Sequence, residues 1–438
     1  MLFFVVLFGL LFQTVDAKAS VFDAETFTLS NGLQVVVVEN RRAPVVTQMV
    51  WYKTGAIDDP LGKSGIAHLL EHLMFKGTAA VPDGEFSKII ARNGGTENAF
   101  TSFDYTAYYQ NIARDRLELV MFLESDRMKN LRFSQKDFDP ELEVVKEERL
   151  MRTENNPAAL LNERKSAALW GGDHPYGRPV IGTKKELPAL TLNDAKRFYQ
   201  THYAPDNAVL VVAGDITAEE LKPLAEKYYG KIPPRRTAEA KRQFHQSYPV
   251  RSKIEMRHPL VGVVWLVGGL LVGWFLSEKK EQSFAYAVLD EILGTYRLGK
   301  MHKHFVSDKK LARQAGTHYS GFALDRGTFS FFLTAREGED LNGAEKELDR
   351  FLSSVSFTQK DADNAKKRLV ADLEYMNDNP ESAANLVGSF YVLGMTVDDL
   401  KNWKKNIENV SLEDIRKAHE DMRTAAYVTT YLMPEDAP

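Results

Sequence analysis

The 438-residue chain is too long for one ordinary hydrophobic core, so two or more domains are expected. Its hydrophobic content of 44% and charged content of 26% are typical of a globular protein, and a net charge of −4 gives no reason to expect nucleic acid or an anionic membrane surface as a partner. The absence of cysteine excludes disulfides and thiolate metal sites, so any metal must be bound by His, Asp or Glu.

The N-terminus carries a short apolar run. Residues 2–12 are too few to span a bilayer as a mature helix. Val15-Asp16-Ala17 follows with small or short side chains at the positions that precede a signal-peptide cut. We therefore expect residues 1–17 to be a signal peptide and the mature protein to be periplasmic or otherwise extracytoplasmic. Because no Lys or Arg precedes the run, an uncleaved membrane anchor is the alternative.

The first half mixes strand and helix patterns without strict βαβ alternation, which favours an α+β fold. Residues 27–39 predict a hairpin that turns at Asn31-Gly32 and continues into a β-branched strand. Further strands are expected at residues 45–54 and 206–215. Helices are expected at residues 64–76, 83–93, 113–129, 138–154, 193–203 and 217–229.

A change of composition separates the two halves. Residues 231–257 carry a Pro pair, many Lys and Arg, and no periodicity, which predicts an interdomain linker. Beyond the linker the order of elements recurs. Strands are expected at residues 315–335 and 426–432, and helices at residues 283–305, 340–354, 358–376 and 411–421.

The halves also match weakly at one equivalent place. Leu192–Tyr199 and the strand after it are similar to Leu412–His419 and the final strand. We therefore predict two homologous α+β domains, residues 18–230 and 258–438, each with a mixed or antiparallel sheet and flanking helices.

The second domain begins with an unusually apolar stretch. Residues 261–276 are uncharged, but they fall short of the roughly 20 residues of a spanning helix. We expect a buried strand here, or a hairpin that turns at Gly268-Gly269. Membrane association through residues 261–276 is the less favoured alternative.

The sequence His68-Leu-Leu-Glu71-His72 lies in the helix expected at residues 64–76. Residues four apart share a helix face, so His68 and His72 can bind one metal ion. Glu71 lies beside the pair and can hold a proton of a metal-bound water, whose pKa zinc lowers toward neutrality. This inverted HxxEH order is a peptidase signature. The alternative is a helix with two ordinary histidines.

A catalytic zinc usually has three protein ligands and one open position, so a third ligand is expected elsewhere. The helix expected at residues 138–154 offers Glu141 and Glu148, which lie two turns apart on one face. Acidic helices are usually just solvated, so this helix alone does not identify the ligand.

At these motifs the sequence resembles the pitrilysin-type HxxEH zinc metallopeptidases, and among them the bacterial branch that is similar to processing peptidases. The resemblance implies that Glu148, 76 residues after His72, is the third ligand of one Zn²⁺ per chain. It implies a supporting catalytic-site role for Glu141, seven residues earlier. Glu147 is the alternative ligand in the neighbouring register. The family fold implied is a two-lobed half-chamber.

Residues 94–101 are similar to the family's substrate-binding strand, which binds the peptide as an added strand. The resemblance implies that Asn98 and Ala99 contact the substrate. Without the family context, an ordinary glycine turn and strand is the alternative. His174 lies in another loop that matches the family, and we expect it to be structural rather than a metal ligand.

The second half carries no copy of the site, because the equivalent helix places Ala287, Asp290 and Glu291 at the motif positions. Active members of the family often carry an Arg and a Tyr seven residues apart in this half, where this chain has Val306 and Arg313. Some bacterial members divide the zinc motif and the Arg/Tyr pair between two chains. We therefore expect a heterodimer with a homologous chain that carries the pair.

The resulting prediction is a zinc-dependent metalloendopeptidase. It would hydrolyse extended peptides by Glu71-assisted attack of zinc-bound water. A non-catalytic structural subunit of the same family is the alternative, and the intact motif argues against it. A processing peptidase that cuts a specific presequence would share this chemistry and differ only in substrate.

Overall fold

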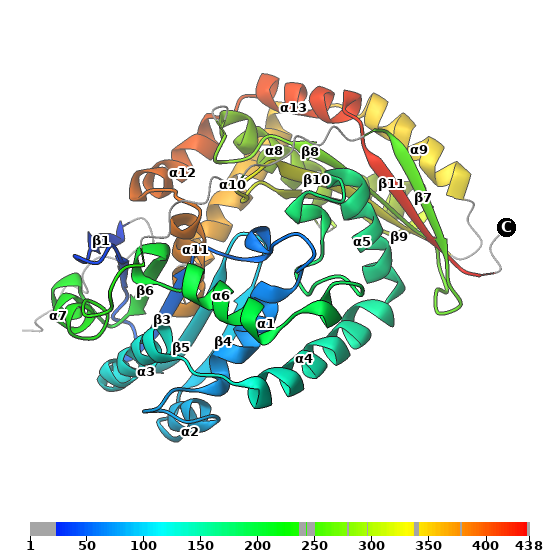
Figure 1. Cartoon of the computed structure of the whole chain (residues 1–438). Coiled ribbons are helices and arrows are strands. Elements are labelled where there is room, and N and C mark those ends of the chain that lie inside the picture. Colours follow the sequence, from blue (N-terminus) through cyan, green and yellow to red (C-terminus); the bar gives the residue numbers. More distant parts are fainter. Residues whose placement is uncertain are drawn as a thin grey trace, which may run out of the picture.

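The computed structural model describes residues 23–235, 242, 250–277, 280–295, 297–336, 341–376 and 379–435. These residues form two α+β lobes, each built on one sheet, as the sequence predicts (Figure 1). The leader expected at residues 1–17 lies outside the described residues. Of the helices in the described ranges, none combines the length and the apolar character needed to cross a membrane.

A mixed six-stranded sheet, of order β1-β2-β6-β3-β5-β4, forms the first lobe. Its strands are β1 (Glu25–Thr28), β2 (Gln34–Glu39), β3 (Val45–Tyr52), β4 (Thr96–Thr101), β5 (Thr106–Ala113) and β6 (Ala208–Gly214). The predicted hairpin is confirmed, because β1 pairs antiparallel with β2 and Gly32 turns the chain at φ +89°. β4 pairs with β5, and within the described residues no strand covers its other edge.

All helices predicted for the first lobe are present, and one further helix was missed. They are α1 (Ile66–Leu73), α2 (Glu85–Arg92), α3 (Leu117–Asn130), α4 (Gln135–Arg149), α5 (Pro157–Trp170), α6 (Leu192–His202) and α7 (Ala218–Tyr228). A π-helix, Leu150–Glu154, extends α4 to the predicted end. The missed helix is α5, which buries only Leu161, Leu169 and Trp170 and so lacks a clear helical stripe.

The second lobe is a five-stranded sheet of order β7-β11-β8-β10-β9. Its strands are β7 (Ser252–Arg257), β8 (Trp265–Val272), β9 (Ala312–Ser320), β10 (Gly327–Ala335) and β11 (Val428–Met433). The end of the expected linker, residues 252–257, is therefore a strand, and it pairs parallel with β11. The single strand-like stretch expected at residues 315–335 is two antiparallel strands.

The apolar stretch at residues 261–276 contains the central strand β8, so the prediction of a buried strand is correct for residues 265–272. The hairpin alternative is wrong, because β8 runs unbroken through Gly268 and Gly269 between β11 and β10. A Cβ at Gly268 would overlap the ring of Phe331 on β10. Glycine at this position makes room for a cross-strand aromatic ring and does not make a turn.

The second half of the chain contributes the remaining α-helices. They are α8 (Lys280–Gly294), α9 (Leu341–Ser354), α10 (Gln359–Met376), α11 (Pro380–Val392), α12 (Val397–Asn409) and α13 (Leu412–Thr424). The helix predicted over residues 283–305 was too long, since α8 ends at Gly294 and a π-helix, His302–Asp308, follows. A Cβ at Gly294 would approach Thr317 of β9 too closely, so the chain passes near this strand where the helix ends.

Each lobe contributes one helix to the sheet of the other. α5 packs on β11, β7 and β8 of the second lobe, whereas α11 packs on β6, β3 and β2 of the first (Figure 1). Gly388 of α11 lies against the indole of Trp51, and this contact leaves no space for a side chain. One face of the first sheet consequently shares a hydrophobic core with the second lobe.

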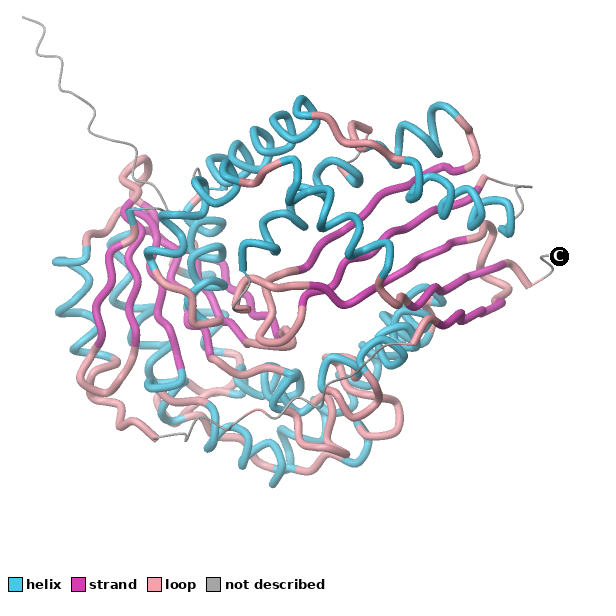
Figure 2. Tube along the Cα trace, turned by 90° about the horizontal axis from the view of Figure 1, so that it is seen from above, coloured by secondary structure: helices cyan, strands magenta, loops and turns pink. Residues whose placement is uncertain are grey.

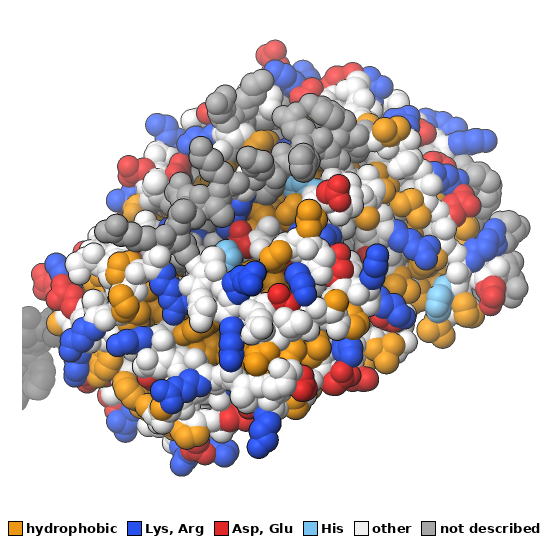
Figure 3. Space-filling view, viewed as in Figure 1, with side chains coloured by type: hydrophobic (Ala, Val, Ile, Leu, Met, Phe, Trp, Pro, Cys, Tyr) orange, Lys and Arg blue, Asp and Glu red, His pale blue; other side chains and the backbone are white. Residues whose placement is uncertain are grey.

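The two sheets run in different directions and carry helices along them (Figure 2). Acidic and basic side chains are interspersed over the face shown in Figure 3.

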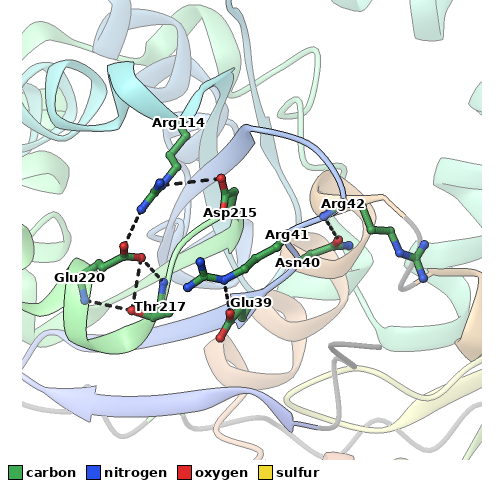
Figure 4. Close-up of polar contacts among 8 residues, drawn as sticks. All are labelled: Glu39, Asn40, Arg41, Arg42, Arg114, Asp215, Thr217 and Glu220. Carbon is green, nitrogen blue, oxygen red and sulfur yellow. Dashed lines mark hydrogen bonds and ion pairs between the residues drawn. The ribbon is translucent and has the colours of Figure 1, made fainter. Parts of the chain in front are cut away.

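On the first lobe, Arg114 at the end of β5 donates to Glu220 Oε1 at 2.5 Å, and its Nε lies 3.8 Å from Asp215 Oδ2 (Figure 4). Glu220 also forms a capping box with Thr217, so these exposed contacts hold the loop between β6 and α7.

Candidate metal centre

The HxxEH motif lies on α1, whose start is fixed by the buried carboxylate of Asp59. The Gly65 N–H donates to Asp59 Oδ2 at 2.6 Å, and the Ala67 N–H donates to Oδ1 at 3.1 Å. The first N–H groups of a helix have no partner within the helix, so Asp59 satisfies two of them. Burial raises the pKa of Asp59 to about 8 despite these bonds.

The structure brings the side chains of His68, His72 and Glu148 together, with one ligand atom of each within 4.8 Å of the others. Glu148 Oε2 lies 3.7 Å from His68 Nε2 and 3.4 Å from His72 Nε2. Donors bound to a tetrahedral zinc at about 2.0–2.1 Å lie about 3.3–3.4 Å from one another. The spacing therefore fits a zinc ion. Glu147 is exposed and lies outside the group.

His68 has the protonation state, and Glu148 the unfilled hydrogen-bonding capacity, that a metal ligand requires. Burial lowers the pKa of His68 to about 3, so its imidazole is neutral and can bind a cation. Glu148 Oε1 pairs with Arg152 at 2.7 Å, but Oε2 is buried and accepts no hydrogen bond. A buried carboxylate oxygen without a partner is costly, and a cation between the two imidazoles would satisfy it.

Glu141 orients the second histidine. Its Oε2 lies 3.3 Å from His72 Nδ1, and its Oε1 lies 2.6 Å from Lys76 Nζ. His72 can therefore donate from Nδ1 and turn Nε2 toward Glu148, the usual arrangement of a metal-binding histidine. The hydrogen bond from His72 lowers the pKa of Glu141. Burial acts to lower the pKa of His72, but the bond to Glu141 and the nearby carboxylates raise it overall.

Glu71 connects the cluster to the edge strand. Thr101, the last residue of β4, donates from Oγ1 to Glu71 Oε2 at 2.5 Å. Burial raises the pKa of Glu71, an effect that moves the carboxyl toward the range useful for proton transfer near neutral pH. The candidate base thus lies where α1 meets the end of β4.

Asn98 and Ala99 lie on β4, the strand with an unpaired edge. The Ala99 N–H donates to the side-chain Oδ1 of Asn98 at 2.9 Å. An extended peptide can add to an open strand edge through main-chain hydrogen bonds. Both residues therefore lie on a strand with an edge that can accept such a peptide. The last residue of this strand, Thr101, contacts Glu71.

The remaining candidate positions are not part of the cluster. His174 is 1% exposed; its Nδ1 accepts from the Tyr176 N–H and its Nε2 lies 2.9 Å from Asp325 of the second lobe. This contact joins the lobes, in agreement with a structural role. Val306 lies in the second π-helix and Arg313 on β9.

The second lobe has no comparable metal group within its described residues. On α8, Asp290 accepts from Thr317 at 2.6 Å and Glu291 pairs with Arg368, so both carboxylates already have partners. The carboxylates at the equivalent positions of this lobe are therefore engaged in contacts within the protein and are not grouped for a metal ion.

Sequence reasoning missed four supporting residues. Arg152 follows Glu148 by four residues, a helical pair that spacing alone could have suggested. Lys76 likewise follows His72 by four residues. Asp59 and Thr101 reach α1 from other elements, and nothing local in the sequence indicates these contacts.

Comparisons with known proteins agree with this arrangement. The family described as Insulinase (Peptidase family M16) matches residues 34–184, and the Peptidase M16 inactive domain matches residues 189–369. The zinc protease PqqE of Helicobacter pylori is 31% identical over 428 residues, which cover 94% of this chain and 93% of that protein. Mitochondrial-processing peptidase subunit beta of Lentinula edodes is 26% identical over 419 residues, covering 90% of this chain and 86% of that protein. The crystal structure of a protease from Helicobacter pylori matches with a TM-score of 0.84 and 29% identity, covering 94% of this chain and 99% of that one.

Proposed function

This chain belongs to the insulinase family of zinc proteases, peptidase family M16, and we propose that it is an active metalloendopeptidase that cleaves extended peptides. One observation carries the proposal. Two imidazoles and a buried carboxylate oxygen without a hydrogen bond converge at zinc-ligand spacing beside Glu71.

His68, His72 and Glu148 would hold one Zn²⁺ and leave a fourth position open. Bound there, zinc supplies a Lewis acid that lowers the pKa of water and polarises a peptide carbonyl. Glu141 holds the imidazole of His72 in the orientation that binding requires. Arg152 neutralises the second oxygen of Glu148, so the carboxylate keeps one oxygen directed at the imidazoles.

Glu71 is the proposed general base. Its carboxylate accepts a proton from the water that attacks the scissile carbonyl and passes that proton to the leaving amine. The hydroxyl of Thr101 fixes one oxygen of Glu71, and the other remains available for this transfer. Burial raises the pKa of Glu71, which makes its carboxylate a better proton acceptor than an exposed one.

The open edge of β4 is the proposed substrate platform. A peptide that adds to this edge must be extended, because only extended backbone matches the hydrogen-bond spacing of a strand. The contact between Thr101 and Glu71 would bring that peptide to the base. Asn98 covers the Ala99 N–H in the free protein, so binding would exchange this side-chain bond for one to the peptide.

Two parts of the proposal rest on sequence. The mature protein would act outside the cytoplasm after removal of residues 1–17. A homologous chain would supply the Arg/Tyr pair, since Val306 and Arg313 stand at those positions here. A non-catalytic structural subunit would have no need for the converging donor set, so we favour the enzyme.

The test compares the zinc-loaded mature chain with Glu71→Gln on a mixed set of quenched peptides. We expect one zinc per chain in both proteins, and hydrolysis by the wild type but not by Glu71→Gln. Because the Arg/Tyr pair would come from the homologous chain, we expect this hydrolysis to require its addition, and full activity of the wild type by itself would refute the heterodimer. Hydrolysis by Glu71→Gln at the wild-type rate, or failure of the wild type to bind zinc, would refute the proposed mechanism.

A further inference from the structure

A cavity of about 390 Å³ lies between the two lobes just beyond the end of β4. Its walls are the turn at residues 102–105, helix α5, and strands β9 and β10 with the loop between them. Thr101 contacts Glu71, and the turn that follows Thr101 lines the cavity. A peptide paired with β4 and continuing past Thr101 would run toward this space.

Two cationic side chains line the cavity, Lys165 from α5 and Arg326 from the loop between β9 and β10. The stem of Lys165 lies over β8, where a Cβ at Gly269 would be 3.8 Å from Lys165 Cδ. Burial lowers the pKa of Lys165. Within the described part of the chain, no hydrogen bond or ion pair satisfies its ammonium group, an unfavourable state for a half-buried cation.

The acids nearby are already engaged. Asp104 also lines the cavity, but its Oδ1 accepts from the Tyr176 hydroxyl and its Oδ2 from the Leu324 N–H. Asp325 holds His174 at 2.9 Å, and its contact with the Arg326 side chain is a distant 4.0 Å. Five serine and threonine hydroxyls complete the polar wall: Ser102, Ser166, Ser320, Thr328 and Ser330.

We propose that this cavity is a substrate subsite that binds a carboxylate of the extended peptide, with Lys165 as its principal partner and Arg326 in support. The inference rests on the proposed function, because it assumes a peptide on β4. A carboxylate that enters gives the ammonium of Lys165 a charged partner, and the hydroxyls can donate to its remaining lone pairs. The carboxylate can come from an Asp or Glu side chain or from the peptide C-terminus.

The experiment measures the affinity of labelled peptides for the zinc-loaded Glu71→Gln chain, which is expected to bind without cleaving. One host peptide is prepared with Glu, Gln or Lys at each position in turn, and as free acid and amide. At one position, or at the terminus, we expect the carboxylate form to bind about tenfold more tightly than its neutral counterpart. Adding Lys165→Met should abolish this ratio, and Lys165→Glu should reverse it in favour of Lys.

Arg164→Glu is the matched control, since it makes the same charge change on the same helix at an exposed residue that does not line the cavity. It should keep the wild-type ratio. Tighter binding of Glu than of Gln at one position identifies a side-chain carboxylate as the ligand. Tighter binding of the free acid than of the amide identifies the peptide C-terminus. Equal affinities throughout, or a ratio that survives Lys165→Glu in protein of native zinc content, would overturn the inference. Hydrolysis by the wild type without this preference would refute the subsite alone, whereas the preference without any hydrolysis would refute the proposed activity alone.

Discussion

Replacing Glu141 by glutamine tests how the metal centre is held together. The carboxylate connects Lys76, 2.6 Å from Oε1, to His72, whose Nδ1 lies 3.3 Å from Oε2. Glutamine has the same shape and can still accept one hydrogen bond, but it removes the negative charge. The imidazole of His72 then becomes a weaker electron donor and is free to rotate away from the position in which Nε2 faces Glu148.

The expected effect is a loss of zinc affinity. Removing a partner that orients a metal-binding histidine typically costs 10–100-fold in affinity, or about 1.4–2.7 kcal/mol. The side chains of His72 and Glu141 are 23% and 15% exposed, so water can replace part of the lost contact. We therefore expect the lower end of the range, about tenfold.

Competition with a chelating dye measures the zinc dissociation constant of Glu141→Gln directly. Glu143→Gln is the control, because Glu143 lies on the same helix but is exposed and pairs with Lys146. Its zinc affinity should match that of the wild type. An unchanged dissociation constant in Glu141→Gln would refute the idea that Glu141 orients the ligand.

Glu148→Ala should lose zinc after dialysis whereas Glu147→Ala should keep it, because only Glu148 lies within the cluster; equal zinc contents would contradict the assignment. Gly388→Ala should lower the free energy of unfolding in urea by about 1–3 kcal/mol, since the added methyl group would overlap Trp51; wild-type stability would argue against the packing between the lobes. Burial raises the pKa of Asp104 from 3.8 to about 6 in the folded protein, so the stability that this group contributes is present below about pH 4 and is lost as the pH rises to about 6. Asp104→Asn should remove that loss, of at most about 3 kcal/mol, and a difference between variant and wild type that does not change from pH 4 to pH 7 would contradict the shift.

Helix α1 could be predicted from the sequence because the HxxEH motif and its spacing are local. The spacing of His68 and His72 places both on one helical face, and the structure has them there. Choosing Glu148 over Glu147 required the family resemblance, and burial in the structure separates the two. The contacts of Asp59 and Thr101 with α1 are tertiary, so no pattern in the sequence indicates them.

The fold shows the same division between local and tertiary information. Strands with a clear apolar pattern, such as β2 and β6, were found, whereas α11 was missed. α11 buries residues around most of its circumference because it packs between the first sheet and the helices α10 and α12 of the second lobe, and so it lacks the single stripe of a surface helix. The Gly268-Gly269 pair indicated a turn, although its role is to admit the ring of Phe331.

One continuous stretch of chain connects the metal centre to the cavity between the lobes. α4 carries Glu148, the following π-helix carries Arg152, and α5 carries Lys165 (Figure 1). Arg149 fixes the angle between the two helices, because its guanidinium binds both oxygens of Glu163 on α5 at 2.7 and 3.0 Å. α5 also packs on β11, β7 and β8, so the second lobe contacts the helix that Arg149 ties to α4. Among the described residues the second lobe provides no ligand to the cluster, but it supports the segment that carries Glu148.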